Sequence, residues 1–291
     1  MPFRFKKSES PAKAVRRVSR ERISVARERL RDGARSAAIH DVRREIKKLR
    51  AIFRLARESD GGGAVRKSVK ALRQAAGYLA APRDARVRLK AFEKLTGGGG
   101  RQFAEIETLL QRHCRRETRR FRKNDFVAAA DRILRKIDRR AGGLKIKASG
   151  WSALEPGLKA SYVRGQAAFN LVRRKPLPEN FHDWRKDVKN LWYYFLLLRP
   201  AWPAELRAMT DELELLGGQL GEDHDLLLLQ QFVRRHCDSR TPETAVLNRM
   251  IVSRQKELRA AALKLGARLY AETPDVLCRR LGNHWDLWRG K

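Results

Sequence analysis

Two ten-residue segments of this chain carry the same order of a histidine, an acidic residue and several cations. Residues 40–49 read HDVRREIKKL and residues 182–191 read HDWRKDVKNL, so five of the ten positions are identical. Imidazole, guanidinium and ammonium groups donate hydrogen bonds and positive charge, which is the chemistry that binds phosphate oxygens. The segments lie 142 residues apart in a chain of 291 residues. A repeat of this period indicates a duplicated structural unit, and we predict an anionic ligand bound between two related halves.

Each segment, drawn as an α-helix at about 100° per residue, separates an apolar face from a basic face. In the first copy the apolar face contains Val42, Ile46, Leu49, Phe53 and Ala56, and the basic face contains His40, Arg43, Lys47, Arg50 and Arg54. In the second copy the basic face contains His182, Arg185 and Lys189, and then gives way to Trp192, Tyr193 and Leu196. Like charges three or four residues apart destabilise a helix by roughly 0.2–0.5 kcal/mol per pair. A stripe of cations without intervening acids is therefore better explained by a bound anion than by solvent alone.

A second pair of segments supports the duplication. Residues 79–87 (LAAPRDARV) correspond to residues 220–228 (LGEDHDLLL). Asp84 lies 43 residues after Asp41, and Asp225 lies 42 residues after Asp183, so the two halves share their internal spacing. The carboxylate of Asp84 either orders the adjacent Arg83 or caps a helix.

The composition favours a polyanionic partner. Lys and Arg outnumber Asp and Glu by 66 to 33, which gives a formal net charge of +33 and an isoelectric point near 11.1. Residues 1–140 hold 41 basic and 16 acidic residues, whereas residues 141–291 hold 25 and 17. A charge of this size is usually neutralised by nucleic acid, an anionic membrane surface or polymeric phosphate. We expect the first half to supply most of the attraction.

Cysteine usage and hydropathy indicate the compartment. The three cysteines (Cys114, Cys237 and Cys278) form no CxxC pair, which predicts a reducing compartment and no structural zinc. No apolar run follows the basic start of the chain, and the longest apolar stretch, residues 191–198, is too short to cross a bilayer. We therefore expect a cytoplasmic protein with no membrane association, no cofactor and no metal.

Glycine clusters and prolines divide the chain into segments rich in helix-forming residues, with almost no strand-like alternation. The predicted helices are 11–32, 36–58, 64–80, 84–95, 101–141 (with a break near Asn124), 157–175, 179–199, 203–217, 222–237, 242–271 and 275–289. The predicted fold class is all-α, with two pseudo-symmetric helical bundles. The first bundle takes residues 1–145 and the second takes residues 146–291, with the connection near 142–156.

These motifs together resemble one known family. The pattern HDxRxxxKxLR at 40–50, the RD at 83–84, ENFHDWRKDVK at 179–189 and LGEDHD at 220–225 resemble the CHAD domain (conserved histidine α-helical domain), over about residues 8–285. The resemblance implies two four-helix-type bundles related by a pseudo-twofold axis, around a basic central channel or cleft that binds inorganic polyphosphate. The family's motif positions fall on His40, Arg43, Lys47, Lys48 and Arg50, and on His182, Arg185, Lys186, Lys189 and Tyr193. Asn190 replaces Lys48 and Trp192 replaces Arg50 in the second half, so we expect that half to bind less tightly.

Other residues could join the same site. The candidates beyond the motif positions are Arg20, Arg54, Arg83, Arg115, Arg119 and Tyr162, where a tyrosine hydroxyl would donate to a phosphate oxygen. We predict non-catalytic polyphosphate binding, weak nucleic-acid binding and association with polyphosphate granules. Near the anion the pKa values of His40 and His182 should rise, so binding should be tighter in mild acid.

Two alternatives remain open. The His-Asp pairs at 40–41, 182–183 and 224–225 could belong to a metal-dependent phosphohydrolase of the HD type, although the neighbouring cations would repel a divalent metal. A general nucleic-acid binder would have the same composition. Base contact also requires exposed aromatic residues, and the pattern places Phe53, Trp184 and Phe195 on the core face.

Overall fold

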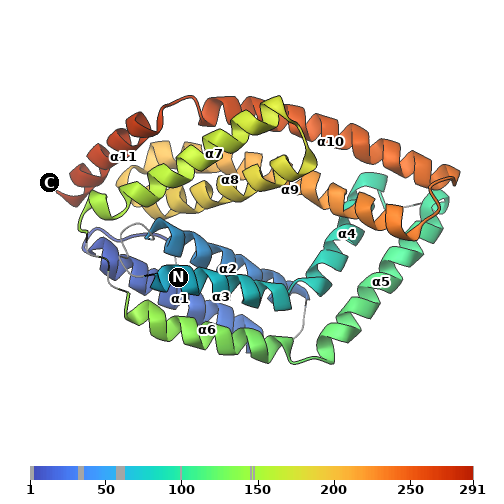
Figure 1. Cartoon of the computed structure of the whole chain (residues 1–291), viewed down its shortest axis with the longest axis horizontal. Coiled ribbons are helices and arrows are strands. Elements are labelled where there is room, and N and C mark those ends of the chain that lie inside the picture. Colours follow the sequence, from blue (N-terminus) through green and yellow to red (C-terminus); the bar gives the residue numbers. More distant parts are fainter. Residues whose placement is uncertain are drawn as a thin grey trace.

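The computed structural model describes residues 3–31, 36–56, 63–98, 100–144, 146 and 148–290, and most of them lie in α-helices (Figure 1). The first series is α1 (Pro11–Arg31), α2 (Ser36–Leu55), α3 (Ala64–Tyr78), α4 (Ala81–Thr96), α5 (Ala104–Arg122) and α6 (Phe126–Gly142). The second is α7 (Glu155–Arg174), α8 (Pro178–Leu198), α9 (Pro203–His236), α10 (Pro242–Leu269) and α11 (Pro274–Arg289). No strand occurs within the described ranges, and the predicted all-α fold class is confirmed. The internal pseudo-symmetry stays a prediction.

The helix boundaries follow from local sequence. The break predicted near Asn124 is confirmed, because α5 ends at Arg122 and α6 begins at Phe126. Helices α10 and α11 begin after Thr241 and Thr273, whose hydroxyl oxygens accept hydrogen bonds from backbone amides three residues later, at 3.4 Å in both helices. A proline then occupies the first turn of each helix, where its missing amide proton leaves no intrahelical bond unmade.

One predicted boundary is wrong. The glycines at 217–218 were expected to separate two helices, 203–217 and 222–237, but α9 continues through them to His236. A glycine inside a helix costs only about 1 kcal/mol relative to alanine. Burial of Leu213, Leu216 and Leu220 on the same helix outweighs that cost.

Two hydrophobic cores hold the helices together, and both draw residues from each half of the chain. The larger core contains Val42 and Ile46 of α2 together with Trp184 and Val188 of α8. The smaller core lies at the other end of the molecule, where the α4–α5 hairpin packs against the C-terminal part of α9 and the N-terminal part of α10 (Figure 1). The two halves therefore pack as one body, in which α9 and α10 reach from one core to the other.

The backbones of the two halves also touch directly. A Cβ atom added to Gly157, near the start of α7, would lie 2.0 Å from the carbonyl oxygen of Leu55 at the end of α2. We therefore expect Gly157→Ala to lower the free energy of unfolding by about 1–3 kcal/mol, because the two backbones must separate. Urea unfolding followed by circular dichroism measures the change. Gly77→Ala is the matched control, since no atom lies within 4 Å of its added Cβ; equal losses in both variants would contradict the contact.

Candidate functional site

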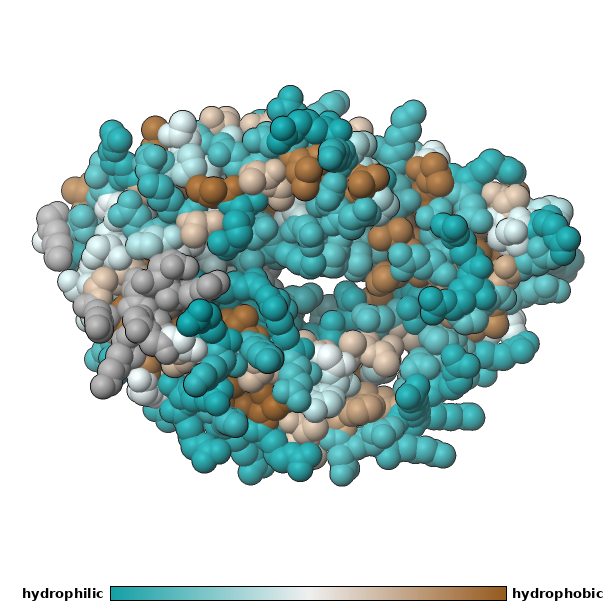
Figure 2. Space-filling model, viewed as in Figure 1, coloured by the Kyte–Doolittle hydropathy of each residue, from teal (hydrophilic) through white to brown (hydrophobic). Residues whose placement is uncertain are grey.

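The basic faces of the two motif helices meet in the middle of the molecule. Lys47 of α2 lies within electrostatic reach of Arg43 on its own helix, Arg83 of α4, and Arg185 and Lys189 of α8. We call these five residues the central basic cluster. Figure 2 shows an opening through the molecule in the region that α2, α4, α8 and α9 surround in Figure 1. The structure thus brings together the repeated positions that the sequence predicts at one site.

The charges of this cluster are poorly compensated. Burial, together with the charges of Arg185, Arg83, Arg43 and Lys189, lowers the pKa of Lys47 to about 7. Burial also lowers the pKa values of Arg185 and Lys189. In the part of the chain that the structure describes, no carboxylate lies within 4.0 Å of the side-chain nitrogens of Lys47, Arg185 or Lys189. Half-buried cations without partners are costly, and an anionic ligand would relieve that cost.

Two carboxylates, Asp84 and Asp225, border the cluster. They occupy equivalent positions in the aligned segments 79–87 and 220–228. Asp84 accepts a hydrogen bond from the Arg83 guanidinium at 3.0 Å, so it orders the adjacent arginine. Asp225 lies among Arg83, Arg185 and Lys47, and burial raises its pKa while those cations oppose the rise. Its Oδ1 atom is buried without a hydrogen-bond partner. Asp84 therefore orients Arg83, and the two acids are too few to neutralise the five cations of the cluster.

The two motif histidines lie in different surroundings. His40 is exposed and lines a pocket of about 590 Å³ between α2, α4 and α5. His182 is half-buried and packs its ring against His224, with 4.1 Å between the ring centroids. Partial desolvation lowers the pKa of all three imidazoles, including that of His40 on the pocket wall, and it lowers the pKa of His224 to about 3 because His182 and Arg185 also lie nearby.

Sequence reasoning missed several residues of this site. His224 is not among the predicted binding residues, although it occupies the position that corresponds to Arg83 in the second pair of segments. Arg86 and Lys90 line the His40 pocket together with Arg83. Both follow Arg83 at helical spacing on α4, a signal that could have identified them.

The basic face of α2 connects two pockets. Its N-terminal end reaches the His40 pocket, and its C-terminal end reaches a pocket of about 410 Å³ between α2, α3, α7 and α8. The cations lining this second pocket, which we call the Arg54 pocket, are Arg54, Arg73, Arg164 and Lys186. Arg54 donates a hydrogen bond to Asn190 Oδ1 at 3.1 Å, and Lys186 pairs with Asp183 at 2.6 Å. Arg50 lies between the cluster and this pocket, near Arg43, Arg54 and Arg73.

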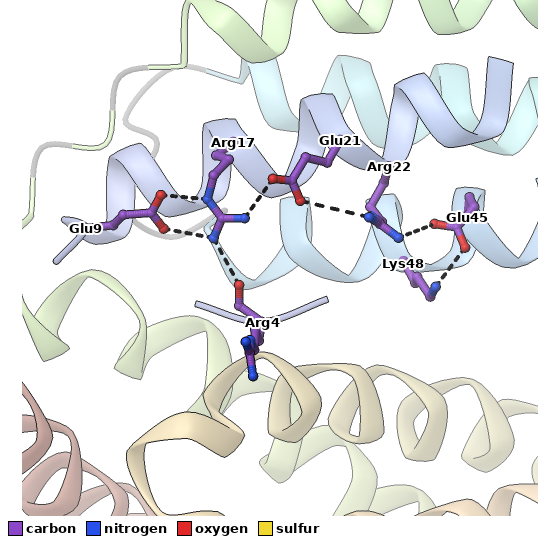
Figure 3. Close-up of polar contacts among 7 residues, drawn as sticks. All are labelled: Arg4, Glu9, Arg17, Glu21, Arg22, Glu45 and Lys48. Carbon is purple, nitrogen blue, oxygen red and sulfur yellow. Dashed lines mark hydrogen bonds and ion pairs between the residues drawn. The ribbon is translucent and has the colours of Figure 1, made fainter. Parts of the chain in front are cut away.

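Lys48 does not face the site. It pairs with the buried carboxylate of Glu45 at 2.7 Å, and Glu45 also accepts from Arg22 at 3.4 Å. Figure 3 shows the chain of contacts that continues through Glu21 and Arg17 to Glu9. The charge of Lys48 therefore helps to hold α1 against α2, and the motif position is structural here.

Five other candidates lie outside the central basic cluster. Arg20 lines a groove between α1 and α6, with Asp138 at 3.6 Å. Tyr162 is fully buried and donates to the backbone oxygens of Leu269 and Glu272, both at 3.1 Å, so its hydroxyl is not free for a ligand. Tyr193 is buried at the edge of the cluster. Arg115 and Arg119 are exposed on α5.

Known proteins share this architecture. The CHAD domain family model matches residues 17–234. This chain belongs to the CHAD family. The crystal structure of the CHAD domain from the plant Ricinus communis superimposes with a TM-score of 0.67 at 15% identity, covering 93% of this chain and 96% of that one. PptA from Streptomyces chartreusis superimposes with a TM-score of 0.62 at 16% identity, covering 87% and 96%. No curated protein matches the sequence.

Neither a metal site nor a membrane span is found in the described part of this CHAD chain. No group of three or more His, Cys, Asp or Glu residues there is arranged to hold a metal ion. The helices in the same ranges lack the combined length and apolar character that crossing a bilayer requires. The stacked His182 and His224 lie beside Arg185, which would repel a divalent cation.

Two glycines of α9 lie against the long cations of α8, and one of them leaves space that a side chain would fill. A Cβ atom on Gly217 would lie 2.8 Å from Lys189 Cε and 2.9 Å from its Nζ. A Cβ atom on Gly221 would lie 3.6 Å from the Arg185 guanidinium. The Lys189 ammonium also lies over the Trp192 ring, 4.5 Å from its centroid. The missing Cβ of Gly217 therefore leaves room for the Lys189 side chain against α9.

We expect Gly217→Ala to displace the Lys189 ammonium and to weaken anion binding by about threefold to tenfold, the loss of one charge-assisted contact. Gly218→Ala is the matched control, because its added Cβ has open space around it. Both variants should keep the fold, since alanine favours helix more than glycine does. Isothermal titration calorimetry in the wild-type and Lys189→Ala backgrounds tests the effect, which should vanish when Lys189 is absent. An undiminished effect in that background would contradict the positioning role.

Proposed function

We propose that this chain binds inorganic polyphosphate between its two halves, without catalysing a reaction. The observation that carries the proposal is the central basic cluster, in which Lys47, Arg185 and Lys189 converge without ion-pair partners among the described residues. The cluster lies on a basic stripe that joins two pockets. A linear polymer of phosphates fits such a path, because it presents a negative charge at every repeat.

Family membership supports the same ligand, since the resemblance to CHAD domains implies polyphosphate binding. Affinity would come from many charge-assisted contacts and from release of counterions, so it should increase with chain length and decrease with salt. We further propose that the protein acts in the cytoplasm, in association with polyphosphate granules.

The geometry favours polyphosphate over nucleic acid. Phe53, Trp184 and Phe195 are each 0% exposed, so they cannot stack on bases. Trp192 lies beneath the Lys189 ammonium. The site therefore offers charge without a surface for base recognition, and nucleic-acid binding is expected to be weak and independent of sequence.

Titration at near-physiological salt with long-chain polyphosphate, single-stranded DNA and duplex DNA tests the proposal. We expect the dissociation constant for polyphosphate to be at least about 100-fold lower than that for either nucleic acid, a difference of about 2.7 kcal/mol. Equal affinities that decrease in parallel as salt is raised would identify a general polyanion binder and contradict the proposal.

A further inference from the structure

Helix α5 carries a dense group of exposed cations outside the central site. Residues 112–123 contain Arg112, Arg115, Arg116, Arg119, Arg120, Arg122 and Lys123, and all seven side chains are exposed. Their one acidic neighbour in the segment is Glu117, which pairs with Arg116 at 3.6 Å. None of the other six cations has an ion-pair partner among the described residues.

Some other cations on the surface of the molecule are paired with acids. On α6, Asp131 pairs with Arg135 and with Arg27 of α1, both at 2.7 Å. On α10, Arg254 pairs with Glu222 and Glu257. The cations of α5 instead repel one another at three- and four-residue spacing, which disfavours the helix. An uncompensated surface of this kind is explained when an anion covers it.

The α5 cations adjoin the His40 pocket. Cys114 and Thr118 of α5 line that pocket, together with Arg86 and Lys90 of α4. Arg115 and Arg119 each follow one of these lining residues in the sequence. With Arg112 and Arg122 they form a stripe at three- and four-residue steps, about 15 Å long at 1.5 Å per residue. The stripe therefore runs along α5 beside the residues that line the pocket.

The chemistry of this surface selects the occupant. The seven large hydrophobic residues that are well exposed in the described chain are Val163, Leu171, Leu177, Leu215, Val252, Val276 and Leu287, and none belongs to α5. The stripe thus lacks the aromatic groups that stack on bases and the apolar groups that insert into a membrane. It offers guanidinium groups alone, which match closely spaced phosphate oxygens.

We propose that the α5 stripe, formed by Arg112, Arg115, Arg119 and Arg122, binds the part of a polyphosphate chain that emerges from the His40 pocket. This inference rests on the proposed function and extends it. The stripe makes affinity depend on chain length. A chain short enough to lie along the basic face of α2, about 21 Å from His40 to Arg54, fills the central site and does not reach α5. A longer chain contacts both surfaces.

Two polyphosphate lengths and one pair of matched variants test the inference in the full chain. In the α5 variant, Arg112, Arg115, Arg119 and Arg122 are replaced by glutamine, which preserves helix propensity. In the control, the exposed α6 residues Arg132, Arg135, Lys136 and Arg139 are replaced by glutamine, which removes the same net charge. Circular dichroism and thermal unfolding check the folding of both variants.

We expect the α5 variant to lose about 30-fold in affinity for the long chain, equivalent to four exposed ion contacts, and less than about threefold for the short chain. The slope of log affinity against log salt should also become shallower for the long chain, by roughly 3. The α6 control should change neither affinity by more than about threefold.

Equal losses for both chain lengths, or equal losses in the α6 control, would show that α5 acts only through the overall charge and would overturn the inference. An unchanged affinity for the long chain would overturn it as well. If the wild-type chain bound neither polyphosphate, the proposed function would fail, and this inference with it.

Discussion

Replacing Lys47, Arg185 and Lys189 together by glutamine is expected to weaken polyphosphate binding by about 10³-fold or more. Each residue contributes a charge-assisted contact of roughly 1.5 kcal/mol, so the three amount to about 4.5 kcal/mol. Lys47 comes from the first half of the chain, and Arg185 and Lys189 come from the second half. The two second-half side chains lie near the Lys47 ammonium group. Isothermal titration calorimetry or fluorescence anisotropy with long-chain polyphosphate measures the change.

The same variant should fold at least as well as the wild-type chain. The cations it removes repel one another and have no ion-pair partner among the described residues, so their loss relieves repulsion in the free protein. Replacement of the exposed Arg132, Lys136 and Arg139 of α6 removes an equal charge and provides the control. A similar loss of affinity in both triple variants would show that net charge, and not this cluster, determines binding.

The central basic cluster also changes the expected difference in binding loss between substitutions in the first half and substitutions in the second half. The charge counts predict that replacing His40, Arg43 and Lys47 by alanine should harm binding more than replacing His182, Arg185 and Lys189. In the structure Arg43 and Lys47 adjoin Arg185 and Lys189, so both triple variants remove part of the same cluster. We therefore expect comparable losses, and a difference above about tenfold would restore the asymmetric interpretation.

Sequence periodicity predicted the helices, and it predicted which residues lie on the apolar and basic faces of the two motif helices. Both predictions depend only on the spacing of residues along one helix. The apolar face of α2 is buried in full, with Val42, Ile46 and Leu49 each 0% exposed. The convergence of Lys47, Arg185 and Lys189 agrees with the expectation, drawn from the repeated motif, that the two basic faces lie close together. These features need only the order of residues along a helix.

Other features depend on contacts between distant segments and could not be predicted in this way. Lys48 has the same charge as Lys47, yet it faces α1 because a buried glutamate, Glu45, lies one turn away next to Arg22. Gly217 resembles a helix breaker in the sequence, but its lack of a Cβ makes room for Lys189 of another helix. The stacking of His182 on His224 joins α8 to α9, and no local pattern specifies that crossing.

Polyphosphate binding is expected to weaken as pH rises above 7. Burial and the charges of Arg185, Arg83, Arg43 and Lys189 hold the pKa of Lys47 at about 7 in the free protein. A bound polyanion stabilises the ammonium form and raises that pKa. Below pH 7 Lys47 is already largely protonated, so binding requires no proton uptake at Lys47. Above pH 7 binding must take up a proton, and the dissociation constant should rise by up to about tenfold per pH unit.

Below pH 7, the dependence of polyphosphate affinity on pH is expected to come from the histidines. Burial lowers the pKa values of His40 and His182 in the free protein, so both imidazoles are largely neutral at neutral pH. The polyanion should raise these pKa values too, and binding should tighten further as pH falls toward 6. Measurements of affinity at intervals between pH 6 and 9 would reveal both effects, and an affinity unchanged between pH 6 and 8 would contradict them.

Lys47→Arg separates the titration of Lys47 from that of the ligand. A guanidinium group stays protonated across this range, so the variant should keep the wild-type affinity near pH 6 and lose most of the decline above pH 7. Any ionisation of the terminal phosphates is the same for both proteins. Calorimetry in buffers of different ionisation enthalpy should detect uptake of up to one proton at pH 8 by the wild-type chain and much less by the variant. An equal pH dependence in the two proteins would mean that Lys47 is not the group that couples proton uptake to polyphosphate binding.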